Sequence, residues 1–560
     1  MKKKSVALTL LATGALAFST ASFTQSERYF EIARNLDIFA SLFKEVNSAY
    51  VDEVVPARIV KTGIDAMLKS LDPYTNYIPE DDIEDFRTMT TGQYGGIGAM
   101  VVKREGKTII TMPHEGFPAQ KAGLLIGDEV IRIDGVAVDT RNQGDVSKLL
   151  KGQAGTVVKL EVKRYGVDKP FEVPITRANI QIDNVPYYGM VSANIGYLQL
   201  QGFTVDAGKE VRDAVTALKA QGAKKLIFDL RDNPGGLLNE AITISNLFVE
   251  KGKEIVSTKG KLTEWNKVYR GLDTPLDTQI PIAVLASGRS ASAAEIVAGV
   301  LQDYDRAVLI GERSFGKGLV QATRPLPYNS QLKVTTAKYY IPSGRCIQEL
   351  DYAHRRADGS VVKFADSTRT AYKTAVGRTV YDGGGVAPDV PVTDPEIADI
   401  TRTLIQKGYI FDFATRYRSQ HPTIASAKDF KLMPAEYERF IAFLQTKDVS
   451  YKTGVETAVE ELVKQAKDNK HYDDIKGDVA AMQKKISLNK ANDLVRFKSE
   501  ILPILESDIV SRYYFQKGVV EASFDHDEDV KAAVSVLNDD LRYATLLRPT
   551  AVVGAPAAKK

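Results

Sequence analysis

The chain has 560 residues, of which 44% are hydrophobic and 26% charged, a composition typical of globular proteins and enough for three or four domains. The formal net charge is only +3, and no long basic run occurs beyond the first residues, so nucleic acid is not an expected partner. Cys346 is the single cysteine, which excludes an intrachain disulfide and a multi-cysteine zinc site. No cofactor is expected.

The N-terminus has the three-part layout of a secretory signal. Three lysines at positions 2–4 precede an apolar stretch from Val6 to Phe18, and small residues follow around Ala21. The stretch is shorter than the ~20 residues that a membrane-spanning helix needs, although an uncleaved anchor remains an alternative. We therefore expect residues 1–24 to be a signal peptide and the protein to be exported.

Two amphipathic helices are predicted next, between Glu27 and the turn at Asp72-Pro73. Their apolar residues recur at helical spacing, as in Ile32, Leu36, Phe39, Phe43 and Val46. We assign residues 27–88 to an N-terminal helical region. The two readings left open are a packing helix pair and an arm through which copies of the chain form a homo-oligomer.

Residues 90–177 change to short strands punctuated by glycine. The block AGLLIGDEVIRIDG resembles the strand-turn-strand signature of bacterial PDZ domains. The earlier block, Gly95 to Ala99, would supply the loop whose backbone N–H groups hold the carboxylate at a peptide C-terminus. The candidate peptide-binding residues are Gly96, Ile97, Gly98 and Ala99. An ordinary turn is the alternative for this first block.

Residues 185–395 alternate apolar strands with helical patterns, which predicts an α/β layer structure with a largely parallel central sheet and catalytic groups at strand ends. The strand-like segments are IGYLQL, LIFDL, PIAVLA, AVLIGE and KVTTAKYYI. After Pro395 the sequence is charged and helix-rich, and in residues 396–560 we identify no chemical motif.

Ser292 lies where the buried strand from Pro281 to Ala286 gives way to an apolar-periodic helix. A nucleophile at such a turn is accessible and has backbone N–H groups near any oxyanion. The alternative is that this serine only caps the helix.

A serine nucleophile needs a base, and Lys317, between two glycines, is the candidate. A lysine serves only if burial lowers its pKa from about 10.4 toward neutrality, which tight packing around glycines favours. Gln321, four positions on, shares a face with Lys317 in an extended segment and would orient the amine. A surface lysine in a glycine turn is the alternative, and the segment lacks the spacing of a phosphate-binding P-loop.

Other serine chemistries fit less well. None of the five histidines lies in a recognisable strand-end motif, which disfavours a Ser-His-Asp triad. Glu295 stands where a Ser-x-x-Lys motif starting at Ser292 would have its lysine.

The segment from Asp229 to Gly236 ends another buried strand in a polar turn with two glycines. Peptide hydrolysis needs N–H donors about 3 Å from the developing oxyanion, and such a turn can supply one. The second donor would be the N–H of Ala293. A strand-terminating turn with a structural ion pair between Asp229 and Arg231 is compatible with the same role.

Taken together, these motifs resemble the carboxyl-terminal processing peptidases, the tail-specific serine proteases of family S41. The likeness covers roughly residues 30–395, through SLDPYTNYIP, YGGIGA, the PDZ block, IGYLQLQGF, DLRDNPGGLL, SASAAEI, GERSFGKGLVQ, YYIPSGRCIQ and VAPDVPV. The resemblance implies that Ser292 is the nucleophile, Lys317 the general base and Gln321 its assistant. It also implies an oxyanion hole made by Gly236 and Ala293. Two departures are Ala294 and Cys346, where the family usually has serine.

The resemblance further implies a crotonase-like or ClpP-like α/β protease core with an inserted PDZ domain, N-terminal helices and a helix-rich C-terminal extension. The expected activity is that of an endopeptidase of the bacterial periplasm or cell envelope, acting through a Ser-Lys dyad and an acyl-enzyme on proteins with exposed C-termini. A non-catalytic PDZ scaffold and a transferase using the same acyl-enzyme are the alternatives. Delivery of substrate by an adaptor stays open, as does whether the PDZ domain activates or inhibits.

Overall fold

The computed structural model describes residues 27–549, except residues 394, 395 and 491. The predicted signal peptide lies outside these described residues. No helix among them is long and apolar enough to cross a membrane. The chain divides into two compact units, one made of residues up to 77 with residues 332–334, the other of the remaining residues.

The first unit contains the two predicted helices, at residues 27–49 and in α2 (Pro56–Lys69). Helix α2 begins at a proline, whose fixed φ and missing N–H suit the first turn of a helix. Part of the apolar row on the first helix is exposed, with 50% of Ile32, 64% of Leu36 and 52% of Phe39 accessible to solvent. Phe43 and Val46, at the C-terminal end of the same row, are half-buried.

In the second unit, an antiparallel sheet with two short helices forms the predicted PDZ-like domain. Its apolar side chains alternate along the strands, so that Val158, Leu160 and Val162 of β7 all point into one core. The sheet strands are β3 (Ala99–Arg104), β4 (Lys107–Pro113), β5 (Glu129–Ile133), β6 (Val136–Ala137), β7 (Val157–Lys163) and β8 (Phe171–Thr176). The helices are α4 (Pro118–Lys121) and α5 (Gln143–Leu150), after α3 (Ile83–Thr91). Strand β2 (Gln93–Gly96) pairs with β9 (Ala178–Gln181).

The protease-like core is built on a six-stranded sheet in the order β10-β11-β12-β15-β16-β23. Only the edge strand β10 runs antiparallel to its neighbour. The bounds are β10 (Tyr187–Ser192), β11 (Ile195–Gln199), β12 (Lys225–Asp229), β15 (Ile282–Ala286), β16 (Ala307–Gly311) and β23 (Val390–Pro391). Every residue of β15 and β16 is buried, as expected for parallel strands covered on both faces.

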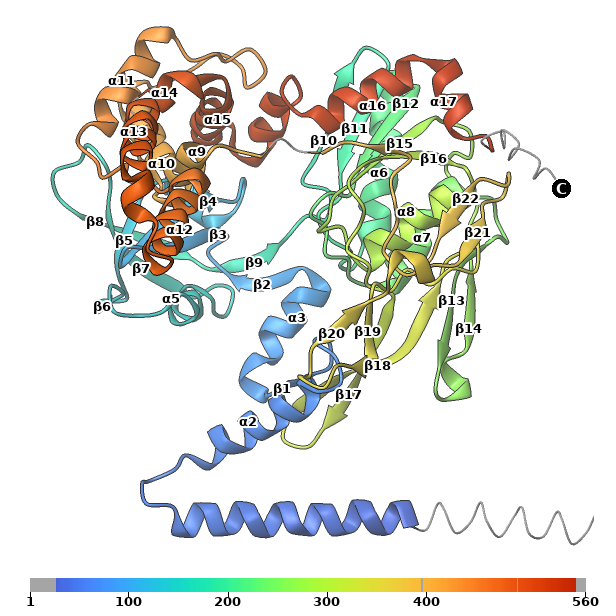
Figure 1. Cartoon of the computed structure of the whole chain (residues 1–560). Helices are drawn as coiled ribbons and strands as arrows, with labels where there is room; N and C mark the ends of the chain where they lie inside the picture. The colour runs from blue at the N-terminus through green and yellow to red at the C-terminus, as the bar shows by residue number, and fades with distance from the viewer. Residues whose placement is uncertain (1–26, 394–395, 491, 550–560) are drawn as a thin grey trace, which may run out of the picture. The chain divides into compact units, whose positions relative to one another are not determined.

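Different parts of the chain cover the two faces of this sheet. Helices α6 (Ala207–Ala220), α7 (Leu238–Phe248) and α8 (Ala293–Asp303) pack on one face, against Leu226, Phe228 and Val284 among others. Helix α16 (Glu528–Asn538) packs on the other face, beside β12 and β15 in Figure 1. The C-terminal extension is therefore part of the layered core.

One strand of the predicted series does not join the central sheet. The segment KVTTAKYYI belongs to β18 (Ser330–Tyr340), which pairs antiparallel with β13 (Glu254–Gly260). Strand β14 (Lys267–Arg270) lies on the other side of β13. Because β18 pairs antiparallel in a separate sheet, its expected place among the strands of the parallel sheet was wrong. Unlike β15, it has few fully buried residues. The remaining strands are β17 (Leu319–Leu326), β19 (Leu350–Arg355), β20 (Val361–Lys363), β21 (Ala371–Lys373) and β22 (Thr379–Tyr381).

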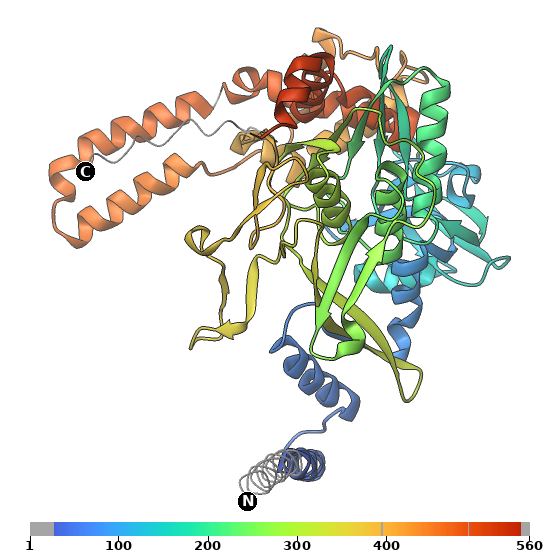
Figure 2. The same ribbon diagram turned by 90° about the vertical axis from the view of Figure 1, so that its right-hand side faces the viewer.

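The C-terminal extension is helical, as predicted. Its helices are α9 (Asp399–Gln406), α10 (Tyr409–Gln420), α11 (Pro434–Leu444), α12 (Gly454–Asp468), α13 (Tyr472–Lys490), α14 (Asp493–Arg496), α15 (Lys498–Ser523), α16 and α17 (Asp540–Leu546). Helices α12 and α13 form a hairpin, the projecting orange pair in Figure 2. Helix α15 is kinked at Phe515, where φ is 51° and ψ is −150°. Before the kink it packs in the helical bundle, and after it Val520 and Phe524 join the sheet-face core with α16.

Candidate active site

Ser292 is the N-cap residue of α8, in the predicted strand-to-helix turn after β15. Its φ of 57° and ψ of −113° are unusual for a residue with a side chain. Backbone strain of this kind persists only where the surroundings enforce it, and it is concentrated at functional sites. Ser292 is half-buried, whereas the rest of α8 from Ala293 onward is buried.

The turn around Ser292 is fixed by a buried carboxylate three residues later. Glu295 is completely buried, and its Oε1 accepts hydrogen bonds from the hydroxyl of Ser314 (2.6 Å) and the N–H of Gly316 (2.7 Å). Its Oε2 accepts from the N–H of Ser292 (2.8 Å) and the N–H of Lys317 (2.9 Å). The backbone amides of the candidate nucleophile and the candidate base therefore meet on a single oxygen atom.

Burial of Glu295 raises the pKa of its carboxyl group to about 7, against the lowering effect of the hydrogen bonds it accepts. In the sequence, Glu295 served only to exclude a Ser-x-x-Lys motif, and its role in holding the two turns was not predicted. The available signal was an acid inside the otherwise apolar start of a helix, because such a residue is rarely buried without partners.

Lys317 precedes β17 in a loop that packs closely against the following segment. The N–H of Gly318 donates to Oε1 of Gln348 (2.8 Å), and a Cβ added at Gly318 would lie 2.8 Å from the backbone nitrogen of Gln348. Only glycine fits such an approach. The lysine itself is half-buried. The tight packing that the sequence predicted around the amine is present on the backbone side.

Gln321 lies on β17, four residues after Lys317. Its amide nitrogen donates to the hydroxyl of Thr335 on β18, at 3.3 Å. This bond fixes the direction of the amide, and its role toward Lys317 stays a prediction.

The turn after β12 is joined to the Ser292 turn by several hydrogen bonds. The carbonyl of Asn233 accepts from the N–H of Ala291 (2.9 Å), and the hydroxyl of Ser290 donates to the carbonyl of Leu230 (2.7 Å). The fully buried side chain of Asn233 accepts from the N–H of Gly235 (2.8 Å) and donates to the carbonyl of Leu200 (2.7 Å). The two turns thus form one connected structure.

Gly235 brings the turn into direct contact with the nucleophile position. A Cβ added there would lie 2.7 Å from the amide nitrogen of Ala293 and 2.9 Å from Cβ of Ser292. Gly236, the predicted oxyanion donor, follows directly. Within the described residues, no acceptor contacts the N–H of Gly236 or that of Ala293. Gly236 is exposed, whereas Ala293 is buried at 1% exposure. Their joint role as oxyanion donors stays a prediction.

The predicted peptide-binding loop connects β2 and β3, from Gly96 to Ala99. The carbonyl of Ile97 accepts from the N–H of Ala119 (2.8 Å), and that of Gly98 accepts from the N–H of His114 (2.9 Å). Among the residues described, no acceptor is found for the N–H groups of Ile97 and Gly98. The loop is held by its carbonyls, as capture of a carboxylate by its amides requires.

The histidines make their polar contacts away from the Ser292 and Lys317 turns. His354 contacts Asp351, and His421 contacts the carbonyl of Tyr417. His471 contacts Asp474, and His526 contacts Lys431. No cluster of metal-ligating side chains occurs in the described part of the chain.

The carboxyl edge of the central sheet also borders a polar cavity of about 740 Å³. Its lining includes Asp229, Arg231, Asp232 and Glu312, together with Asp529 from α16. The predicted ion pair between Asp229 and Arg231 is present, at 2.6 Å. The contact of Asp529 with Arg231, at 3.0 Å, was not predicted, because no chemical motif was identified in the C-terminal extension.

Comparison with known proteins identifies three parts of the chain. The chain matches the family model of peptidase family S41 over residues 194–354, that of a PDZ domain over residues 95–175 and that of the C-terminal helical domain of probable PDZ-proteases over residues 400–537. A carboxy-terminal-processing protease of Bartonella bacilliformis is 39% identical over 340 residues, which cover 60% of this chain and 76% of that protein. The chain belongs to the carboxy-terminal-processing proteases of peptidase family S41.

Further relatives of this S41 peptidase include a carboxy-terminal processing protease CtpA of Bacillus subtilis. It is 35% identical over 347 residues, which cover 61% of this chain and 72% of that one. A solved photosystem II D1 C-terminal processing protease is 26% identical, covers 63% of this chain and 92% of that one, and superposes with a TM-score of 0.34. The family and the fold class predicted from the sequence are confirmed.

Proposed function

We propose that this S41 peptidase is an exported serine endopeptidase in which Ser292 and Lys317 form the catalytic dyad. The observation that carries the proposal is the shared oxygen of Glu295, which holds the backbone amides of both residues at 2.8 and 2.9 Å. The close packing of the Gly235-Gly236 turn against Ser292 and the start of α8 supports it further.

In this mechanism the neutral amine of Lys317 takes the hydroxyl proton of Ser292 as Oγ attacks the substrate carbonyl carbon. The N–H groups of Gly236 and Ala293 stabilise the oxyanion, and Gln321 orients the amine. The tetrahedral intermediate collapses, the leaving amine takes the proton from Lys317, and an acyl-enzyme remains. Water, deprotonated by Lys317, then hydrolyses the ester and restores Ser292.

The matched test compares the wild-type chain with Ser292→Ala and Lys317→Ala on an unfolded protein substrate. Lys338→Ala is the control, because Lys338 is an exposed lysine of β18. We expect cleavage to fall at least about a thousandfold in the two dyad variants and to stay unchanged in the control. Full activity in a folded Ser292→Ala variant would contradict the proposal, and equal inactivity of all four proteins would favour the PDZ scaffold.

We further propose that substrates are proteins with exposed C-terminal tails, bound through the amides of Ile97 and Gly98 in the β2–β3 loop. The support is the PDZ match over residues 95–175 and the hydrogen bonding of that loop through its carbonyls. Export through residues 1–24 to the periplasm or cell envelope, delivery by an adaptor and assembly through residues 27–49 complete the proposal.

A further inference from the structure

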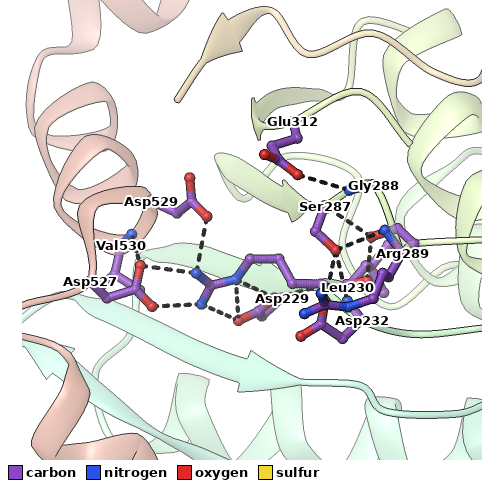
Figure 3. Close-up of polar contacts among 12 residues, drawn as sticks. Asp229, Leu230, Asp232, Ser287, Gly288, Arg289, Glu312, Asp527, Asp529 and Val530 are labelled. Atoms are coloured by element: carbon purple, nitrogen blue, oxygen red, sulfur yellow. Dashed lines mark hydrogen bonds and ion pairs between the residues drawn. The ribbon is translucent and has the colours of Figure 1, made fainter. Parts of the chain in front are cut away.

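The guanidinium of Arg231, in the turn after β12, is enclosed by three carboxylates. Asp229 is the last residue of β12, whereas Asp527 and Asp529 come from the start of α16, 296 and 298 residues further along the chain. In Figure 3, dashed lines join the guanidinium to the carboxylates of Asp229, Asp527 and Asp529. The C-terminal extension therefore reaches the turn that contains the proposed oxyanion donor.

All five N–H groups of this guanidinium have a carboxylate acceptor. Asp527 binds as a fork, with Oδ1 2.9 Å from Nη1 and Oδ2 2.7 Å from Nη2. Oδ2 of Asp529 lies 3.0 Å from Nη1, and Asp229 accepts from Nε (3.0 Å) and Nη2 (2.6 Å). A planar guanidinium with every donor bonded is fixed in both position and orientation.

The cluster is poorly suited to a purely structural role. The side chains of Arg231, Asp527 and Asp529 are only 22%, 16% and 9% exposed, and three carboxylates surround one cation. Burying such groups costs solvation, so ion clusters of this kind are weak sources of stability. Helix α16 is already attached by apolar contacts of Val530 and Leu537 with the sheet.

A direct path leads from this cluster to the proposed active site. Asn233 and Gly235 lie two and four residues after Arg231, and both contact the Ser292 turn as described above. Displacements of about 1 Å in a catalytic constellation can cost a hundredfold in rate. The orientation of Arg231 therefore bears on where the amide of Gly236 points.

We infer that Asp527 and Asp529 are positioning residues for catalysis, which act through Arg231 to hold the Gly235-Gly236 turn in its productive geometry. The inference rests on the proposed function of Ser292 and Gly236. It makes the C-terminal extension a part of the catalytic machinery, although none of its residues touches the reacting atoms.

The test uses the full chain with Asp527→Asn and with the Asp527→Asn/Asp529→Asn double substitution. Asparagine keeps the size of the side chain, and it still caps the helix where Asp527 now accepts from the N–H of Val530. Glu528→Gln is the matched control, because Glu528 lies between the two aspartates on the same helix turn but faces Lys531 in solvent. Each variant is titrated to completion with a fluorophosphonate that labels the active serine, and kcat and KM are measured for an unstructured reporter peptide.

We expect kcat per titrated site to fall about tenfold in Asp527→Asn and further in the double variant, with KM within about twofold of wild type and Glu528→Gln unchanged. A merely structural role lowers the number of titratable sites and leaves kcat per site unchanged, which overturns the inference. If the double variant does not fold, the single variant decides by the same criterion. Ser292→Ala, measured in the same experiment, separates the two claims. If Ser292→Ala stays active, the proposed function fails. If Ser292→Ala is inactive while Asp527→Asn has normal kcat, only this inference fails.

Discussion

At the scale of single residues, Glu295 connects the two halves of the proposed dyad. One of its oxygens holds the amides of Ser292 and Lys317, and the other holds the segment just before the lysine. A carboxylate can accept at both oxygens, whereas the amide of glutamine would present a donor to one of these pairs. The geometry of the dyad therefore depends on a residue that takes no part in bond making.

The raised pKa of Glu295 makes a pH dependence of stability testable with Glu295→Gln. The folded state favours the protonated acid, so this contribution to stability is complete below the unfolded value of 4.5 and is lost as pH rises through about 7. Between pH 5 and 8 we expect the free energy of unfolding of wild type to fall by about 2.5 kcal/mol relative to the glutamine variant. Urea denaturation at several pH values measures this, with Glu250→Gln, an exposed substitution, as the control.

If the free energy of unfolding changed with pH in the same way in wild type and Glu295→Gln, this account of the buried carboxyl group would be contradicted. The same variant should also lose activity at neutral pH, by about tenfold in kcat, because an amide nitrogen opposes one pair of N–H donors. Unchanged kcat would show that the shared oxygen does not order the dyad.

At the scale of elements, α16 completes the core by covering the sheet face opposite α8. Leu537 is buried in this layer at 1% exposure, while Leu541, on the following helix, is 78% exposed. Truncation of a buried leucine removes its transfer free energy and leaves a cavity.

We therefore expect Leu537→Ala to lower the free energy of unfolding by 2–5 kcal/mol and Leu541→Ala to change it by less than about 0.5 kcal/mol. Thermal and urea denaturation of both variants measure the difference. Equal, small effects would mean that α16 is not an integral layer of the core.

The elements also show where sequence reasoning succeeds. Continuous apolar runs such as Ile282–Ala286 and glycine turns at their ends predicted the parallel sheet and the position of Ser292, because both signals are local. Strand β18 was misplaced because an apolar strand pattern does not say which sheet the strand joins. Asp527 and Asp529 were missed for the same reason, since only the fold brings α16 to Arg231.

At the scale of the whole molecule, recognition and assembly use parts of the chain far from Ser292 in sequence. In the proposed function the β2–β3 loop binds a carboxylate, so a free C-terminus should matter. We expect a reporter with an apolar C-terminal tail to be degraded faster than the same reporter with an amidated tail, measured as kcat/KM. Equal rates would contradict carboxylate capture by the amides of Ile97 and Gly98.

The exposed apolar row on residues 27–49 makes a second prediction at this scale. Charge on this row opposes burial against another copy of the chain, so we expect Leu36→Glu/Phe39→Glu to lower the oligomeric state. Light scattering with size-exclusion chromatography measures it, and Lys44→Glu on the same helix is the control for the added charge. An unchanged mass would exclude this helix as the assembly surface.

The most direct test of the central claim is to locate a covalent serine probe on the chain. A fluorophosphonate should modify Ser292 alone, identified by mass spectrometry of the labelled peptide, and labelling should be lost or greatly slowed in Lys317→Ala but not in Lys338→Ala. Modification of another serine, or equal labelling rates in the wild type and Lys317→Ala, would contradict the assignment of Ser292 and Lys317 as the catalytic dyad.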